Sequence, residues 1–327
     1  MKKLLVICGP TATGKTALGV KLAKKFNGEI ISADSRQVYK YMDIGTGKDL
    51  PLPVPVWGLD LVRPNQEFSV SHWVKFAHKV IQNIWTRKKL PIIVGGTGFW
   101  IKALIDGVDS VGIPPDWKLR KKLSHCSITS LLHCLEKLDP ERMRRMNKSD
   151  RNNSRRLIRA IEIALQVKSE KLKVLSKGWS SSGRKSYSSK LKVDKLLTIG
   201  LKTNNKTLYQ RIDKRVDKRI KQGAQKEVRT LIKKGYFWNL PAMSAIGYKE
   251  WQGFLEDSVS LDKVIQRWKY NEHAYARRQM TWFRKPIRQA FGKIHWFDIE
   301  NADWKNDIVK LAKSWYYCNN GTSWDFS

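Results

Sequence analysis

Short apolar runs alternate with helical stretches along the first third of the chain. The runs that we predict to be strands are Leu4–Cys8, Glu29–Ala33, Val56–Val62 and Pro91–Val94. Before the last run, Trp73, Phe76, Val80 and Ile84 recur at the spacing of one helix face. Such alternation is typical of a parallel sheet covered by helices. We therefore predict an α/β fold here.

The pattern changes at about residue 114. From there to about residue 180, apolar positions recur at helical spacing among many charges, with no strand-like run. A Ser/Gly/Lys-rich segment at 179–189 predicts a mobile loop. Strand-like sequence returns at Leu196–Leu201, and two helical stretches and a last strand follow. We place them near 205–234, 261–284 and Ile294–Ile299. The prediction is a catalytic core of residues 1–113 plus 190–327, interrupted by a helical domain at 114–189.

The loop after the first predicted strand completes the phosphate-binding pattern G-x-x-x-x-G-K-[ST]. Its residues are Gly9, Pro10, Thr11, Ala12, Thr13, Gly14, Lys15 and Thr16. A strand precedes the pattern and a helical stretch follows it, which is the context of a P-loop. Backbone N–H groups and the helix N-terminus would bind phosphate oxygens, and Lys15 would reach the terminal phosphate. The Thr16 hydroxyl would be a ligand of Mg²⁺.

Two further stretches follow strand ends, where ligands of open parallel sheets bind. The first begins at Asp34, which would point into the same crevice as Lys15 or cap a helix. Ser35 and Gln37 could contact a nucleobase. The second is the glycine-rich turn Gly95–Gly98, in which Thr97 could hydrogen-bond a ligand. A tight turn from strand to helix would explain the same glycines equally well. Many P-loop kinases and hydrolases have a Mg²⁺-orienting Asp at such a strand end, so its absence argues against ATP hydrolysis.

Charge narrows the range of partners. The chain has 63 Lys and Arg against 29 Asp and Glu, a formal net charge of +34 over 327 residues. Such an excess favours a polyanionic partner. The sequence has no apolar run of about 18 residues, the length that a membrane-spanning helix requires.

The cysteines indicate neither disulfides nor a metal site. The four cysteines are scattered, so they form no disulfide framework, and the pairs His125-Cys126 and His133-Cys134 are better explained as helix residues than as metal ligands. We expect a cytoplasmic protein.

Seven motifs in order along the chain resemble those of the bacterial tRNA dimethylallyltransferase family. They are Gly9–Thr16, Asp34–Tyr39 continuing to Met42–Thr46, Gly95–Gly98, Leu138–Pro140, Arg155–Glu162, Ala245–Glu250 and Arg277–Arg284. The resemblance implies a P-loop NTPase-like parallel-sheet core with an inserted, mainly helical tRNA-binding domain. It also implies transfer of a dimethylallyl group from dimethylallyl diphosphate to adenine 37 beside the anticodon of tRNA, with Mg²⁺ as cofactor.

The same resemblance implies roles for individual residues. Asp34 matches the general base and Thr97 a second contact to the target adenine. One or both of Arg211 and Arg215 match further contacts to the diphosphate, or they belong to a solvated basic helix face. The positions that match tRNA contacts are Asp34, Ser35, Arg36, Gln37, Thr97, Arg120, Arg155, Arg156, Leu157, Ile158 and Arg159. They would grip the anticodon stem-loop mainly through phosphates. The strong like charge favours a monomer.

Two other functions remain open from sequence. An isopentenyltransferase acting on free AMP or ADP would share the core motifs, but its substrate would not require a charge of +34. A P-loop kinase of a small metabolite or nucleic acid would need ATP and an acceptor, and the Gly-Gly-Thr strand end argues against it.

Overall fold

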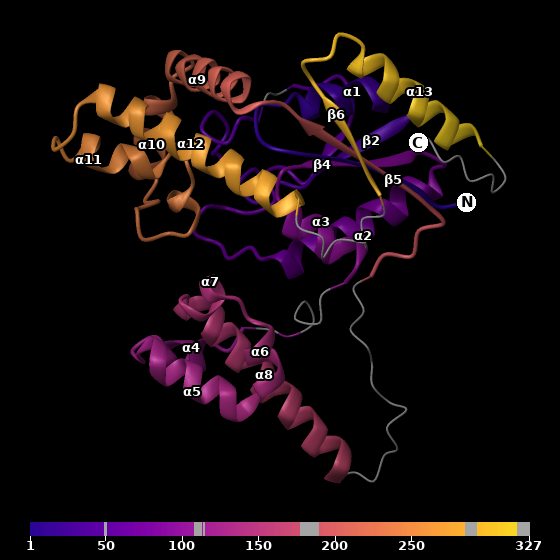
Figure 1. Cartoon of the computed structure of the whole chain (residues 1–327). Coiled ribbons are helices and arrows are strands. Elements are labelled where there is room, and N and C mark those ends of the chain that lie inside the picture. The colour runs from indigo at the N-terminus through magenta and orange to yellow at the C-terminus, as the bar shows by residue number, and fades with distance from the viewer. Residues whose placement is uncertain (49–50, 108–112, 114, 177–189, 285–292, 319–327) are drawn as a thin grey trace. The chain divides into compact units, whose positions relative to one another are not determined.

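The computed structural model describes residues 1–48, 51–107, 113, 115–176, 190–284 and 293–318. The chain divides into two compact units (Figure 1). The core unit comprises Met1–Gly107 with Lys190–Ser327, and the inserted unit is Val108–Ser189. The predicted mobile loop at 179–189 lies outside the described residues.

The core unit is built on a six-stranded parallel sheet. Its strands are β1 (Lys3–Cys8), β2 (Gly28–Ser32), β3 (Val56–Trp57), β4 (Leu90–Gly95), β5 (Lys195–Lys202) and β6 (Ile294–Asp298). They are ordered β3-β2-β4-β1-β5-β6. Because Cys8 pairs with both Gly95 and Gly200, the carboxyl ends of the three central strands meet at one edge. The α/β prediction is therefore confirmed.

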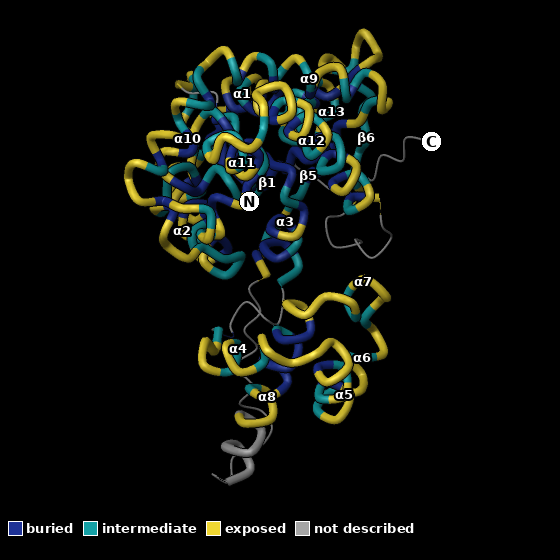
Figure 2. Tube along the Cα trace, turned by 90° about the vertical axis from the view of Figure 1, so that its left-hand side faces the viewer, coloured by how far each residue is buried: buried dark blue, intermediate teal, exposed yellow. Residues whose placement is uncertain are grey.

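Helices cover both faces of this sheet (Figure 1). The helices of the unit are α1 (Lys15–Lys25), α2 (Val70–Thr86), α3 (Gly98–Ile105), α9 (Asn205–Lys221), α10 (Ala224–Lys233), α11 (Gln252–Leu255), α12 (Leu261–Arg284) and α13 (Trp304–Tyr317), with two short 3-10 turns at Ala242–Ser244 and Lys249–Trp251. Leu18 and Leu22 of α1 and Ile308 of α13 pack on one face. On the other face, Trp73 of α2 is fully buried, and its indole donates to the Ser32 carbonyl over 2.9 Å. The central strands are correspondingly buried (Figure 2).

Two predicted elements differ in extent from the observed ones. The predicted strand Val56–Val62 is regular only at Val56–Trp57, and Val62 makes an isolated bridge to Tyr39. Gly58 follows directly at φ +90°, a conformation that takes the chain out of the sheet. The helical stretch near 205–234 is two helices, since Gly223 at φ +96° ends the first and begins the second.

Within residues 113 and 115–176, the part of the inserted unit that the structure describes, the regular elements are all helices. They are α4 (Trp117–Leu123), α5 (Ile128–Leu138), α6 (Pro140–Arg145), α7 (Lys148–Arg151) and α8 (Ser154–Ser176). Leu131 and Leu135 of α5 pack with Leu157 and Ile161 of α8 in a separate hydrophobic core. Apolar positions that recur at helical spacing in this part of the sequence therefore pack against each other in the structure.

Candidate active site

The phosphate-binding pattern lies in the turn between β1 and α1. Thr13 is buried and its hydroxyl donates to the Pro10 carbonyl over 2.9 Å, which closes the turn from inside. Ala12 has a positive φ of 63°, a backbone conformation that is uncommon outside glycine and is often found at functional sites. The amino end of α1 follows directly at Lys15. The turn therefore has the form of an anion-binding site.

Two cationic side chains meet above this turn. The Lys15 ammonium donates to the Pro10 carbonyl over 2.5 Å, and the Arg215 guanidinium of α9 donates to the Thr11 hydroxyl. Burial lowers the pKa of Lys15 to about 8, and the nearby Arg215 acts in the same direction. The carboxylates of Asp34 and Glu272 act in the opposite direction. Two close cations held in this way are suited to an anion of more than one charge.

Asp34 follows β2 and lines the same pocket as Lys15 and Arg215. Its Oδ1 accepts the backbone N–H of Arg36 over 2.8 Å. The residues after it form a turn, so the alternative that Asp34 caps a helix is wrong. One carboxylate oxygen is thus occupied by the turn, and the other can accept a proton or hydrogen bond from a ligand.

Thr97 stands beside Asp34 in a short chain of hydrogen bonds. Its hydroxyl accepts the backbone N–H of Ser35 over 3.2 Å and is hydrogen-bonded to the Tyr275 side chain of α12. Burial is the main cause that raises the pKa of Tyr275, and the Asp34 and Glu272 carboxylates add to it. Tyr275 therefore remains protonated and neutral in the pocket.

Gln279, also on α12, joins two loops of the site. Its side-chain oxygen accepts the Thr11 N–H over 2.8 Å, and its nitrogen donates to the Gly96 carbonyl over 3.2 Å. A Cβ at Gly96 would stand 2.0 Å from this nitrogen, so a side chain there would push the amide away. The phosphate loop and the glycine-rich turn are thereby fixed relative to each other.

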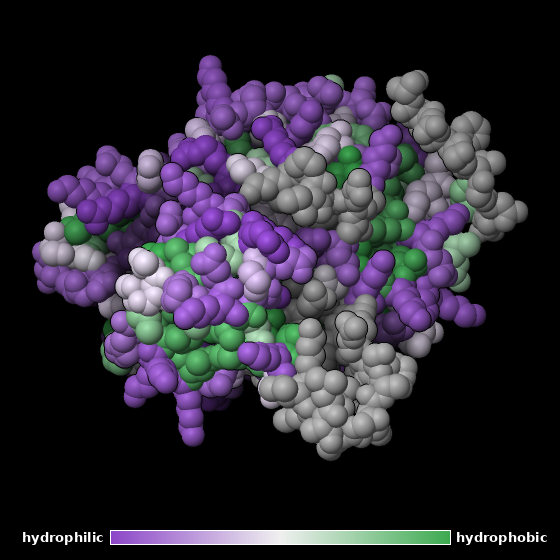
Figure 3. All heavy atoms as spheres, turned by 60° about the horizontal axis from the view of Figure 1, so that its bottom comes forward, coloured by the Kyte–Doolittle hydropathy of each residue, from purple (hydrophilic) through white to green (hydrophobic). Residues whose placement is uncertain are grey.

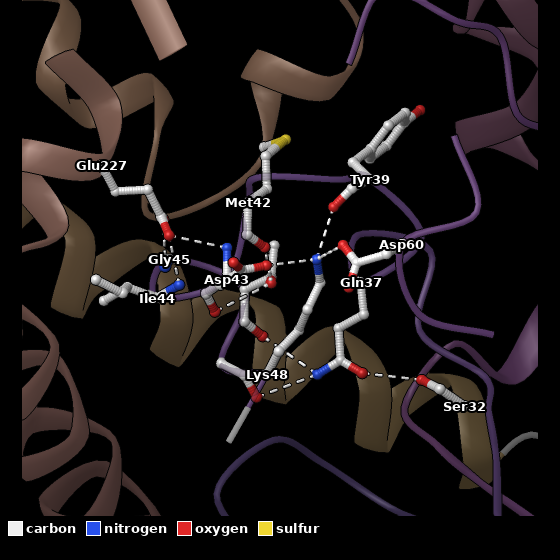
Figure 4. A network of polar contacts seen from close by, with 12 residues as sticks. Ser32, Gln37, Tyr39, Met42, Asp43, Ile44, Gly45, Lys48, Asp60 and Glu227 are labelled. Carbon is white, nitrogen blue, oxygen red and sulfur yellow. Dashed lines mark hydrogen bonds and ion pairs between the residues drawn. The ribbon is translucent and has the colours of Figure 1, made fainter. Parts of the chain in front are cut away.

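The loop that follows Asp34 is held by buried polar contacts (Figure 4). The Lys48 ammonium, whose side chain is 0% exposed, donates to the Tyr39 carbonyl, Asp43 and Asp60 over 2.7, 2.8 and 2.6 Å. Glu227 accepts three consecutive backbone N–H groups, from Asp43 to Gly45.

Gln37 belongs to the same network (Figure 4). Its amide nitrogen donates to the carbonyls of Thr46 and Gly47, and its oxygen accepts the Ser32 hydroxyl. Both amide protons are thus used inside the protein, which leaves one lone pair for a ligand.

The pocket enclosed by these loops has two kinds of wall. Its polar wall is formed by Thr11, Lys15, Thr16, Asp34, Gln37, Arg215, Tyr275 and Gln279. Its apolar wall is formed by Ile30, Leu52, Val56, Leu59 and Val94. A ligand that combines a strong anion with a short hydrocarbon chain would match both walls.

Thr16 and Arg211 occupy the outer side of the phosphate loop. The Thr16 side chain is exposed and lines the same pocket, so its hydroxyl would be available as one ligand of a Mg²⁺ ion. In the described part of the chain, no group of three or more His, Cys, Asp or Glu side chains is placed to hold a metal ion. Arg211 lines a neighbouring pocket with Lys21 and Trp304, rather than the pocket of Asp34.

Some of the predicted tRNA-contact residues of the inserted unit lie at its surface, and others lie in its interior. Arg155 and Arg156 are exposed at the start of α8. Leu157 and Ile158 pack in the hydrophobic core, so their side chains present no surface to RNA. The Arg120 guanidinium makes two hydrogen bonds of 2.9 Å to the buried Glu162 carboxylate.

Arg159 contacts the same carboxylate and also donates to the Ile113 carbonyl over 2.7 Å. Arg120 and Arg159 therefore stabilise the inserted unit, in addition to whatever they contact at its surface.

Of the predicted site residues, the structure brings Thr11, Lys15, Thr16, Asp34, Gln37 and Arg215 together around one pocket. Tyr275, Gln279 and Glu272, which α12 places at or behind this pocket, were not predicted from the sequence. The buried positions of α12 include Val264, Trp268, Ala276 and Phe283. Glu272 and Gln279 lie on the same buried face of the helix. Two polar residues on an otherwise apolar helix face are the signal in the sequence that could have indicated a site there.

Comparison with known proteins decides the family. A family model described as IPP transferase matches residues 37–286, and a second, described as isopentenyl transferase, matches residues 2–55. The first match alone spans more than half of the chain. The chain belongs to the IPP transferase family. The resemblance drawn from the seven sequence motifs is thereby confirmed.

Relatives of this IPP transferase match along nearly its whole length. The tRNA dimethylallyltransferase of Carboxydothermus hydrogenoformans is 43% identical over 304 residues, covering 91% of this chain and 92% of the relative. That of Acetivibrio thermocellus is 37% identical and covers 97% of both chains.

Solved structures agree with these matches. The tRNA delta(2)-isopentenylpyrophosphate transferase of Staphylococcus epidermidis is similar at a TM-score of 0.65 and 34% identity, covering 96% of this chain and 99% of that one. A eukaryotic dimethylallyltransferase acting on tRNA is similar at a TM-score of 0.80 and 27% identity, covering 99% and 82%.

Proposed function

We propose that this protein transfers a dimethylallyl group from dimethylallyl diphosphate to the exocyclic amine of adenine 37 in tRNA. The observation that carries the proposal is the two-walled pocket in an IPP transferase. Lys15 and Arg215 face its phosphate side, Asp34 borders it, and an apolar wall completes it. Relatives that cover nearly the whole chain are named tRNA dimethylallyltransferase.

In this reaction the diphosphate lies in the phosphate loop and the five-carbon chain lies against the apolar wall. The adenine nitrogen attacks the first carbon of the chain. A carbon–nitrogen bond forms, and the carbon–oxygen bond breaks with its electron pair going to the diphosphate. Negative charge develops on this leaving group, and the cationic side chains of Lys15 and Arg215, which already lie at the phosphate loop, would stabilise it by charge and hydrogen bonding. Mg²⁺ held by Thr16 would neutralise further charge on the diphosphate.

Asp34 takes the proton from the adenine amine. This amine is a weak nucleophile because its lone pair is delocalised into the ring. Proton acceptance by a positioned carboxylate accelerates such a step by about 10²–10⁴-fold. Thr97 offers its hydroxyl to the same base. To reach these groups, the adenine must leave the stacked anticodon loop and enter the pocket.

The remaining assignments concern the partner and the state of the protein. We assign the grip on the anticodon stem-loop to the inserted unit and to the segment Asp34–Gln37, supported by the exposed Arg155 and Arg156. Arg211 is kept as a diphosphate or RNA-phosphate contact next to Gly14. A tRNA substrate indicates a cytoplasmic enzyme, and like-charge repulsion at +34 favours a monomer. Among the described helices, none has the length and apolarity needed to cross a bilayer.

The test uses an anticodon stem-loop with consecutive adenines around position 37, dimethylallyl diphosphate and Mg²⁺, followed by mass spectrometry of the RNA. We expect a gain of one C5H8 unit on adenine 37. Asp34→Asn keeps an oxygen for the Arg36 N–H but removes the base, so transfer should slow by about 10²-fold or more while diphosphate binding persists. No gain with the unmodified protein, together with label transfer from γ-labelled ATP, would replace this function by a kinase.

A further inference from the structure

A buried carboxylate lies behind the phosphate side of the pocket. Glu272 of α12 is 6% exposed, and its Oε1 is 3.1 Å from the guanidinium of Arg219 on α9. Arg219 is itself 4% exposed. A buried charge of either sign is costly without a partner, so each group requires the other.

The second oxygen of this carboxylate faces the active site. Glu272 Oε2 is 3.6 Å from Arg215 Nη2, and the same Nη2 donates to the Thr11 hydroxyl of the phosphate loop. Arg215 and Arg219 are four residues apart, which places both on one face of α9. A single carboxylate therefore connects a fully enclosed arginine with the arginine that lines the pocket.

The simplest alternative is that Glu272 only neutralises Arg219. Arg219 has a packing role of its own, because a Cβ at Gly47 would stand 2.1 Å from its guanidinium and the Trp268 ring lies 6.0 Å away. However, different oxygens of Glu272 serve the two arginines. The contact to Arg215 is thus additional to the neutralisation of Arg219, and the two roles can be separated by substitution.

We propose that Glu272 is a positioning residue: it holds the Arg215 guanidinium over the phosphate loop and so sets the affinity of the pocket for the diphosphate group. The proposal rests on the proposed function, in which that group belongs to dimethylallyl diphosphate. An arginine side chain loses much rotational freedom when it binds an anion. A partner that restricts it beforehand removes part of this cost from binding.

The electrostatics of the pocket give a second consequence. The groups that act on the Lys15 ammonium are Arg215 of α9, Asp34 after β2, Cys8 of β1 and Glu272 of α12. Arg215 lowers the pKa of Lys15, whereas the two carboxylates and Cys8 raise it. Loss of the Glu272 charge therefore lowers the pKa of Lys15 further, and Lys15 becomes neutral at a lower pH. This shift reports the charge of Glu272, whereas a loss of pyrophosphate affinity at pH 7, where Lys15 is charged, reports the position of Arg215.

The experiment measures binding of inorganic pyrophosphate to the full chain by calorimetry between about pH 7 and pH 9. Glu272→Gln should weaken binding about three- to tenfold, the effect of one lost charge-assisted contact. Its binding should also decline at a lower pH than that of the unmodified protein. The matched control is Asp217→Asn, which removes an α9–α12 ion pair of 2.7 Å with Lys269 away from the pocket. It should bind pyrophosphate as the unmodified protein does.

A second variant separates positioning from folding. In Arg219→Met with Glu272→Gln, no buried charge is left unpaired, but Arg215 still lacks its carboxylate. We expect this protein to fold and to retain the weakened, pH-shifted binding. Binding equal to that of the unmodified protein would overturn the proposal.

Transfer activity of the unmodified protein is measured alongside. Pyrophosphate binding that depends on Glu272, without transfer to RNA, would reject the proposed function and leave the positioning role standing. Transfer to RNA, together with pyrophosphate binding that does not change in Glu272→Gln, would support the proposed function and reject the positioning role.

Discussion

The charge of Lys15 changes in a pH range close to neutrality. Burial and Arg215 lower its pKa to about 8, so its ammonium form dominates below pH 8 and its neutral form above. A diphosphate requires the ammonium form. We predict that the dissociation constant for pyrophosphate rises about tenfold from pH 7 to pH 9. Calorimetry across this range measures it. Lys15→Arg should give a flat profile, because arginine stays charged; an equally steep profile would assign the titration to another group.

Tyr275 contacts Thr97, the residue that we propose as a second contact to the target adenine. Its hydroxyl is hydrogen-bonded to Thr97, which also accepts the Ser35 N–H. Tyr275→Phe removes this bond and leaves the ring. We predict that kcat falls about two- to tenfold, corresponding to one hydrogen bond, while KM for dimethylallyl diphosphate changes little. Steady-state kinetics with saturating RNA test this. Tyr275→Phe added to Thr97→Ala should cost nothing further, because the partner is already gone.

The loop from Tyr39 to Lys48 is an irregular element whose shape depends on one buried ammonium. Lys48 binds three oxygens, two of them on Asp43 and Asp60, whose side chains are 54% and 39% exposed. In Lys48→Met these carboxylates can hydrate, but the loop loses its central contact. We predict a loss of about 1–3 kcal/mol in the free energy of unfolding, measured with urea. Lys40 is an exposed lysine of the same loop, so Lys40→Met should leave the free energy of unfolding unchanged. A loss as large as that in Lys48→Met would show that the effect is not specific to the buried contact.

Strands, the phosphate loop and most helices could be predicted because their causes are local. Leu4–Cys8 is apolar over its whole length, and the glycine pattern after it fixes the turn. The contribution of α12 could not be predicted in the same way. Whether Glu272, Tyr275 and Gln279 face a pocket depends on how α12 packs against loops that are more than 170 residues away. Periodicity identifies the helix face but not what lies opposite to it.

The same limit applied in the inserted unit. The sequence grouped residues 155–159 as RNA contacts, but a helix turns by about 100° per residue, so five successive residues cannot share one face. Arg155 and Arg156 are exposed, whereas Leu157 and Ile158 are in the core. Residues 157, 158, 161 and 165 are apolar and recur at helical spacing, which predicts that 157 and 158 face a core while the arginines before them face solvent. The motif match alone does not make this distinction.

The charge of the whole molecule should govern how it binds RNA. The excess of 34 positive charges is spread over both units, and Figure 3 shows hydrophilic side chains around apolar areas on one face. Binding to phosphates releases counterions, so affinity falls steeply with salt. We predict that Arg155→Ala, at an exposed arginine, weakens binding of the anticodon stem-loop and reduces the slope of log K against log salt by about 1. Fluorescence anisotropy at several salt concentrations measures both. An unchanged slope would remove Arg155 from the RNA interface.

Arg120→Ala tests the opposite case, in which an arginine of the same unit acts mainly on the fold. Its guanidinium satisfies Glu162, whose side chain is 1% exposed, through two hydrogen bonds. Arg159 remains as a partner, so we predict a moderate loss of about 1–3 kcal/mol in unfolding free energy. Urea unfolding followed by circular dichroism measures this, with Arg155→Ala as the control that should unfold like the unmodified protein. If Arg120→Ala instead lowers the salt slope and leaves stability intact, its guanidinium exchanges Glu162 for an RNA phosphate on binding. Arg120 and Arg155 then belong to one RNA-binding surface of the inserted unit.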